Sequence, residues 1–141
     1  TIAETLGPKT DAGKVRRLGS TAVEQVMASG VSARVSGLLA LGNQVTTNSS
    51  ACSTGTEALA MGCERIRRGA ATRMLVGGAE GESHYIWAGF DAMRVLCRKF
   101  NDAPERASRP MSASAAGFVP AAGAGALMLE SLDSARERGA R

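Results

Sequence analysis

A strand–helix–strand pattern between residues 43 and 79 constrains the fold more than any other part of the chain. Residues 43–50 include a run of β-branched side chains, which is typical of a strand. The following segment has apolar residues at helical spacing as far as Arg68, and Gly69 ends it. Residues 74–79 are a short apolar run between turn residues, which indicates a buried parallel strand. The pattern predicts a βαβ unit with a right-handed crossover in a layered α/β fold.

The segments on either side of this unit extend the same domain. An apolar run predicts a further strand over residues 126–130, and residues 101–120, with three prolines, predict a long ordered loop. A length of 141 residues supports one hydrophobic core, so we expect a single domain over residues 1–141. Helical spacing and stop residues predict the remaining helices: one from an N-cap at Thr21 to a stop at Gly30, and others over residues 32–41, 85–96 and 131–138.

Cys52 lies where the predicted strand meets the predicted helix. The first N–H groups of a helix are unpaired and its dipole is positive there, and both effects favour the nucleophilic thiolate over the thiol. Free cysteines are more often small buried hydrophobes, so the residues alone leave both roles open for Cys52. Cys63 and Cys97 have no comparable context, and we interpret both as buried packing residues.

The patterns of cysteines, glycines and apolar runs exclude several classes of function. Three cysteines without paired spacing favour a reducing compartment, and the chain has no CxxC or His-rich cluster, so we expect no metal. The glycine-rich fragments at residues 77–78 and 123–125 complete no nucleotide-binding motif, so we expect no cofactor. No run approaches 18 apolar residues and no signal pattern is present, so we expect a soluble cytoplasmic protein that does not bind membranes.

The net charge of +4 comes mainly from basic clusters on predicted helices and on the segment that includes Lys14, Arg16 and Arg17. No aromatic side chains interleave with these clusters, so nucleic-acid binding is not supported. Two interpretations stay open for them: solvated surfaces, or a docking surface for an acidic protein. His84 is the one histidine in the sequence, and it is either a partner for Cys52 or a surface or packing residue.

Short motifs follow one another along almost the whole chain, at residues 27–33, 50–55, 77–80, 90–94, 101–110, 117–119, 123–130 and 138–140. Their ordered set resembles the β-ketoacyl-acyl-carrier-protein synthases of the thiolase-like superfamily, closest to the elongating enzymes of bacterial fatty acid synthesis. The resemblance implies a partial thiolase-like fold: α/β/α layers, a mixed sheet, and a buried helix after the nucleophile.

The resemblance also implies an acyltransferase mechanism. Cys52 would form a thioester with an acyl group from acyl carrier protein, and malonyl-carrier protein would lose CO2 and extend that group by two carbons. Phe118 matches the phenylalanine beside the nucleophile, and Phe90 matches a residue of the acyl pocket. Arg94 matches a position that docks the acidic carrier protein, and the looser match of Lys14, Arg16 and Arg17 implies the same role. The strand before Cys52 would pair with its mate in a homodimer.

The chain departs from the family pattern at several places. The family's two histidines and lysine lie downstream of the matched region, so we expect an internal segment of a longer synthase, incomplete and inactive alone. Ser112, Ala115 and Ala116 stand where the family has an acidic residue and an Arg-Asp pair. The alternatives are a non-catalytic fragment that dimerises or binds carrier protein, and a polyketide ketosynthase. Residues 49–54 depart from the Asp-Thr-Ala-Cys-Ser-Ser run common in the latter.

Overall fold

The computed structural model describes residues 2–140, so residues 1 and 141, the ends of the expected domain, lie outside the described residues. The chain forms two compact units. The first unit contains residues up to Gly78 together with those from Gly125 onward, and the second unit contains Ala79–Ala124. Cys52 belongs to the first unit.

Short helices make up the beginning of the first unit. They are α1 (Ile2–Thr5), α2 (Gly7–Asp11), η1 (Val15–Arg17, a 3-10 turn), α3 (Ala22–Val26) and α4 (Gly30–Leu39). Gly30 was expected to end a helix, but it begins α4. The left-handed Ala40, with φ of 50°, ends α4 two residues before the expected stop at Gly42.

The sheet of the described residues has two strands, β1 (Arg73–Glu80) and β2 (Gly123–Glu130), and both predicted strand positions are confirmed. The strands run antiparallel, because Arg73 pairs with Glu130 at one end and Gly77 lies against Ala126 further along. The Ser131 N–H donates to the Thr72 carbonyl at 2.9 Å, which extends the same register. The predicted mixed sheet, with β1 as a parallel strand, is therefore not what these residues form.

Residues 43–50 do not form the predicted strand. They carry no regular secondary structure and no ladder joins them to β1, because β-structure depends on a hydrogen-bonded neighbour. Side chains hold the segment instead. The Thr47 and Ser32 hydroxyls lie 2.6 Å apart, and the Asn43 side-chain amide donates to the Ala70 carbonyl at 2.9 Å. The predicted βαβ unit is thus wrong in its first strand, whereas its helix and second strand are present.

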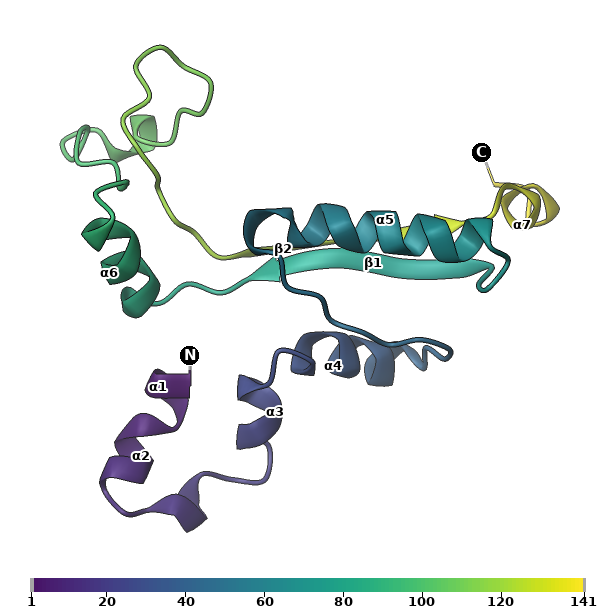
Figure 1. Cartoon of the computed structure of the whole chain (residues 1–141), viewed down its shortest axis with the longest axis horizontal. Helices are drawn as coiled ribbons and strands as arrows, with labels where there is room; N and C mark the ends of the chain where they lie inside the picture. Colours follow the sequence, from purple (N-terminus) through teal and green to yellow (C-terminus); the bar gives the residue numbers. More distant parts are fainter. Residues whose placement is uncertain (1, 141) are drawn as a thin grey trace. The chain divides into compact units, whose positions relative to one another are not determined.

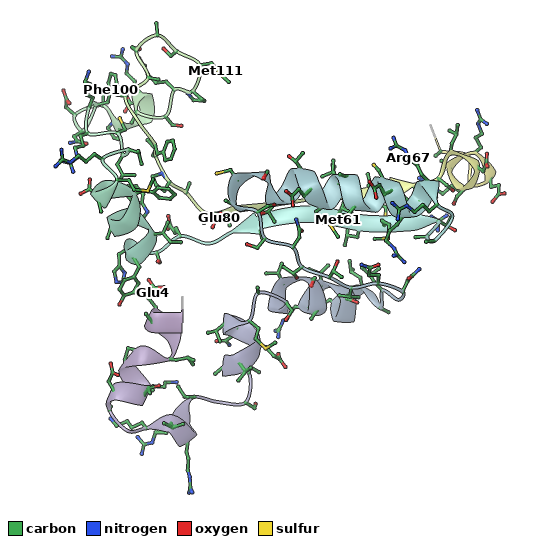
Figure 2. All side chains as sticks on the ribbon, viewed as in Figure 1. Glu4, Met61, Arg67, Glu80, Phe100 and Met111 are labelled. Atoms are coloured by element: carbon green, nitrogen blue, oxygen red, sulfur yellow. The ribbon has the colours of Figure 1, made fainter. Side chains whose placement is uncertain are left out.

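The helix after Cys52 is α5 (Thr54–Arg67), and it lies along β1 (Figure 1). Gly62 makes this approach close, because a Cβ there would lie 2.6 Å from Val76 Cγ1 and 3.0 Å from Leu129 Cδ1. Gly62 is also the residue of α5 that is buried. The remaining faces of α5, including Met61 (41% exposed), are at least partly open to solvent (Figure 2), so the expected buried helix is covered on one side.

Glu130 ties the end of the sheet to α7 (Leu132–Glu137). Its carboxylate accepts hydrogen bonds from Arg73 Nε at 2.6 Å, Ser134 Oγ at 2.8 Å and Arg138 Nε at 2.8 Å. These three donors, with Arg73 first, lower the pKa of Glu130 from 4.5 to about 2. Ser131 caps α7 by accepting from the Ser134 N–H, which confirms the helix predicted after the second strand.

Few apolar side chains are buried. Among the described residues, Ala22 and Val76 are the apolar side chains with less than a tenth of their surface exposed. Larger ones remain open, including Leu38 at 78% and Leu127 at 53%. Within residues 2–140, no helix has the length and apolar character that a membrane span requires.

The second unit contains α6 (His84–Ala92), the 3-10 turn η3 (Pro104–Arg106) and the predicted long loop, whose Met111 is fully exposed (Figure 2). The helix was expected to reach Leu96 but ends four residues earlier, because the chain turns at the left-handed Arg94, with φ of 59°. The returning segment then pairs with Phe118: the Phe118 N–H donates to Val95 at 2.7 Å, and the Cys97 N–H donates to Phe118 at 2.8 Å.

Candidate functional site

Cys52 is exposed and lies at the N-terminal end of α5. It is the middle residue of η2 (Ala51–Ser53), a 3-10 turn that leads directly into α5 at Thr54. Ala51 has φ of 52°, a left-handed conformation that an L-residue adopts at a cost of about 1–2 kcal/mol. This sharp turn places Cys52 at the N-terminal end of the helix, where N–H groups lack intrahelical acceptors.

The hydroxyl of Thr54 stabilises this turn through two hydrogen bonds. Thr54 Oγ1 accepts from the Ser50 N–H at 2.8 Å and donates to the Ala51 carbonyl at 2.7 Å. It thereby bridges the two residues before Cys52 to the first residue of α5. The sequence suggests Thr54 as the N-cap of a capping box with Glu57, but Ser53 is the N-cap and its side chain makes no capping bond. Thr54 has a local role different from the predicted one.

Two glycines bring the head of α5 against β1. A Cβ added at Gly78 would lie 3.3 Å from the Gly55 Cα, so the first helical turn touches the strand backbone to backbone. A side chain at Gly78 would press on this turn, whereas a Cβ at Gly55 would make ordinary contact with the Gly78 Cα at 3.8 Å. The strand therefore determines where the cysteine lies within the first unit.

The other two cysteines differ from Cys52 in exposure. Cys63 and Cys97 are both half-buried, whereas Cys52 is exposed. Cys97 Sγ donates to the Lys99 carbonyl at 3.3 Å. The two were expected to be buried packing residues, and the structure leaves each partly accessible. Cys52 is the cysteine that combines an exposed side chain with a helix start.

Phe90 and Phe118 are brought together in the second unit. Their ring centroids lie 5.6 Å apart with the planes at 77°, an edge-to-face arrangement that aromatic pairs favour. Phe118 is 55% exposed, so one side of the pair is open. The contact joins residues 28 positions apart in sequence, and the resemblance alone brought both into the predicted site. Their role toward a substrate stays a prediction.

His84 begins α6 in the second unit, with its ring centroid 4.1 Å from that of Tyr85. It borders a depression of about 350 Å³ together with Glu82, Ser83 and Trp87. Because Cys52 belongs to the first unit, a pairing of the two stays a prediction. Nowhere in residues 2–140 do three His, Cys, Asp or Glu side chains gather as they would around a metal ion.

The predicted docking cations are all exposed. Lys14, Arg16 and Arg17 lie on and beside η1 in the first unit, where Lys9 Nζ also donates to the Arg17 carbonyl at 3.0 Å. Arg94 lies just after α6 in the second unit. Sequence reasoning missed a neighbouring ion pair between Asp91 and Arg98, whose N–O distance is 2.6 Å. Their seven-residue spacing gives no helical signal, since the contact depends on the turn at Arg94.

Comparison with known families gives a match over almost the whole chain. Residues 3–135 match the family described as "Beta-ketoacyl synthase, N-terminal domain". The 3-oxoacyl-[acyl-carrier-protein] synthase 1 of Escherichia coli strain K12 is 36% identical over 126 residues, which are 89% of this chain and 31% of that protein. The corresponding synthase 2 of Rhizobium meliloti strain 1021 is 46% identical over 92 residues, 64% of this chain and 22% of that protein.

Solved structures show the same similarity in three dimensions. A β-ketoacyl synthase from Burkholderia phymatum STM815 superposes with a TM-score of 0.87 at 33% identity, over 98% of this chain and 34% of that one. A ketosynthase of a type II polyketide synthase, solved with its acyl-carrier protein, gives 0.88 at 29% identity, over 99% and 36%. The chain thus spans about a third of the length of these proteins. The superpositions confirm the predicted α/β, thiolase-like fold class.

Proposed function

Because the chain belongs to the β-ketoacyl synthase family, whose N-terminal domain it matches, we propose that it is the acyl-accepting part of a 3-oxoacyl-acyl-carrier-protein synthase of fatty acid biosynthesis. Cys52 is the proposed nucleophile. The observation that supports this assignment best is the exposed thiol at the head of α5, directly after the left-handed Ala51. An exposed thiol at a helix start is accessible to a thioester substrate and lies beside backbone N–H groups that lack intrahelical acceptors.

In the first proposed step, the Cys52 thiolate attacks the carbonyl carbon of an acyl thioester on an acyl carrier protein. A tetrahedral oxyanion forms, and the backbone N–H of Cys52, at the start of the helix, stabilises its charge. The intermediate then collapses: the bond to the carrier sulfur breaks, that sulfur leaves as a thiolate, and the acyl group remains on Cys52 as a thioester.

In the second step, malonyl-carrier protein loses CO2, and the electron pair of the broken bond becomes a carbanion. The carbanion attacks the thioester carbon on Cys52, and the same N–H stabilises the new oxyanion. The Cys52 thiolate leaves, and the product on the carrier protein is longer by two carbons. Phe90 and Phe118, which form an apolar edge-to-face pair within the second unit, are the residues proposed to bind the acyl chain, as the resemblance implies.

The proposed partner for both steps is an acidic acyl carrier protein. Arg94, Lys14, Arg16 and Arg17 are exposed cations that could pair with its carboxylates, and opposite charges speed such encounters. A ketosynthase with its acyl-carrier protein is among the similar solved structures, which supports this assignment. Replacing Arg94 by Glu should weaken carrier binding and leave alkylation of Cys52 unchanged.

A homodimer is the proposed assembly. Residues 44–49 have no ladder partner in the described part of the chain, so their backbone groups are available to a second copy. Val45 in this segment is 44% exposed, although it is apolar. Light scattering on wild type and on Val45→Pro, which removes one backbone donor, would test this interface, because the variant should shift toward monomer.

Acyl transfer tests the proposed function directly. The protein is incubated with acyl-loaded carrier protein, and its intact mass should rise by one acyl group in wild type and in Cys63→Ala but not in Cys52→Ala. Iodoacetamide should also alkylate Cys52 faster than Cys63 or Cys97 at neutral pH. Carrier binding without any acyl transfer would contradict the catalytic proposal and support a non-catalytic, carrier-binding role.

A polyketide ketosynthase is the second candidate function. Two of the similar solved structures support it: the type II polyketide ketosynthase, and an ishigamide ketosynthase/chain length factor at a TM-score of 0.82 and 28% identity. Products distinguish the two candidates. A fatty acid synthase should stop after one condensation until the keto group is reduced, whereas a polyketide enzyme should add further malonyl units directly.

A further inference from the structure

An ion pair at the end of α6 has no role in the function proposed above. Arg98 Nη2 donates to Asp91 Oδ1 at 2.6 Å, and the side chains are 69% and 50% exposed. Asp91 lies in the last turn of α6, and Arg98 follows it by seven residues. The chain reversal at Arg94 makes the contact, because the Arg94 N–H donates to the Asp91 carbonyl at 2.8 Å and returns the backbone toward the helix.

Three cations gather on this turn: Arg94, Arg98 and Lys99, all at least partly exposed. Among the described residues, one ion pair lies at this turn, and it joins Arg98 to Asp91. Asp91 thus places one negative charge beside Arg98, in a segment that carries three positive charges. We call residues 94, 98 and 99 the α6 turn cations.

Helix stability does not explain a carboxylate at position 91. The C-terminal end of a helix has negative dipole charge, so Asp91 is unfavourable there and a cation would be favourable. An exposed ion pair also contributes little to folding. Asp91 therefore affects the charge of the surface rather than the stability of the helix. It neutralises Arg98 and repels any acidic molecule that approaches the α6 turn cations.

We propose that Asp91 is an intramolecular competitor that limits how tightly an acidic carrier protein binds at the α6 turn cations. This inference rests on the proposed function, since it takes the carrier protein as the partner. On docking, a carboxylate of the partner displaces Asp91 from Arg98, and the freed Asp91 charge remains beside it. Binding is weakened in the bound state, so release is faster, which suits an enzyme that must exchange one loaded carrier for another.

Titration with apo acyl carrier protein tests the inference. Fluorescence anisotropy of the labelled carrier is measured with wild type and Asp91→Asn, at about 25 mM and about 300 mM salt, where screening differs strongly. Asp91→Asn should bind roughly three- to ten-fold more tightly at low salt, and the gain should shrink at high salt. Asp102→Asn is the matched control, since it removes the same charge from an exposed residue of the same unit that forms no ion pair among the described residues.

A double-mutant cycle tests whether the effect of Asp91 on carrier binding acts through Arg98. In an Arg98→Gln background, Asp91→Asn should lose most of its gain, because there is no longer an arginine to release. Equal or weaker binding by Asp91→Asn, or an equal gain in Asp102→Asn, would overturn the inference. If Arg94→Glu weakens binding in the same assay, the carrier partner survives that failure. If no variant binds the carrier at all, the proposed partner and the inference both fall.

Discussion

Gly62 provides a quantitative test of how α5 packs on the sheet. A Cβ at this position would lie 2.6 Å from Val76 Cγ1 and 3.0 Å from Leu129 Cδ1. Carbon atoms pack best at about 3.5–4.0 Å, so Gly62→Ala requires a shift of roughly 1 Å. The Leu129 tip can rotate, but Val76 is β-branched and 8% exposed, and it has little space to move.

The expected free-energy change combines two opposing effects. Overpacking of this kind costs about 1–3 kcal/mol. Alanine is the better helix former by about 1 kcal/mol, which offsets part of that cost. Gly62→Ala should therefore lower the free energy of unfolding by roughly 0–2 kcal/mol relative to wild type.

Gly37 in α4 supplies the matched control, because no atom lies within 4 Å of the Cβ it would gain. Gly37→Ala should gain the helix propensity alone and stabilise the protein by about 1 kcal/mol. Urea unfolding followed by far-UV circular dichroism compares the three proteins, and the two variants should differ by about 1–3 kcal/mol. If the two alanine variants are equally stable, α5 does not press on β1 at Gly62, and the packing argument is wrong.

Three further predictions concern other parts of the structure. Glu130→Gln should destabilise the protein at neutral pH; because the folded pKa of about 2 lies below the ordinary 4.5, the deficit relative to wild type should shrink as pH falls from 4.5 toward 2, and a constant deficit would contradict it. Ala51→Gly should raise the melting temperature by relieving the left-handed strain, whereas Ala51→Val should lower it; the opposite order in thermal denaturation would exclude strain at this turn. Ser83→Ala should cost about 0.5–2 kcal/mol because Ser83 Oγ caps α6 by accepting from the Ile86 N–H at 3.4 Å; Ser108→Ala, at an exposed position of the long loop, should cost almost nothing in the same unfolding assay.

Local sequence pattern was sufficient to locate several of the helices and strands. The apolar run around Val76 and the helical spacing after Cys52 predicted β1 and α5 to within one residue at most boundaries. Ser131 and Gly139 bounded α7 in the same way. For α5 and α7, side-chain spacing and terminal residues signal the helix directly. For β1, the apolar run marks the strand, and β2 supplies its hydrogen-bonded neighbour.

The wrong predictions concern features that depend on contacts with distant residues or on an unusual backbone conformation. Residues 43–50 have strand-forming side chains, but a ladder requires a neighbouring strand, and propensity cannot supply one. The early end of α6 follows from the left-handed Arg94, a conformation that arginine rarely adopts and that no residue type in the segment signals. Thr54 was expected to act through a capping box, but the strained Ala51 offers its carbonyl to the same hydroxyl.

The candidate site shows the same division. The position of Cys52 at a helix start follows from the local pattern, and its exposure agrees with that interpretation. The contact between Phe90 and Phe118 and the pair between Asp91 and Arg98 both depend on the turn at Arg94. Spacing within the sequence could not predict either contact, although the resemblance had selected both phenylalanines.

The small set of buried apolar side chains has a calorimetric consequence. The heat capacity of unfolding grows with the apolar surface that becomes exposed, and compact domains show about 12–15 cal/mol/K per residue. Apart from Ala22 and Val76, the described apolar side chains already contact solvent to about a tenth of their surface or more. The chain by itself should therefore unfold with a heat-capacity increment well below that range. If a protein surface covers Leu38, Leu127 and their neighbours, the heat-capacity increment of unfolding should rise.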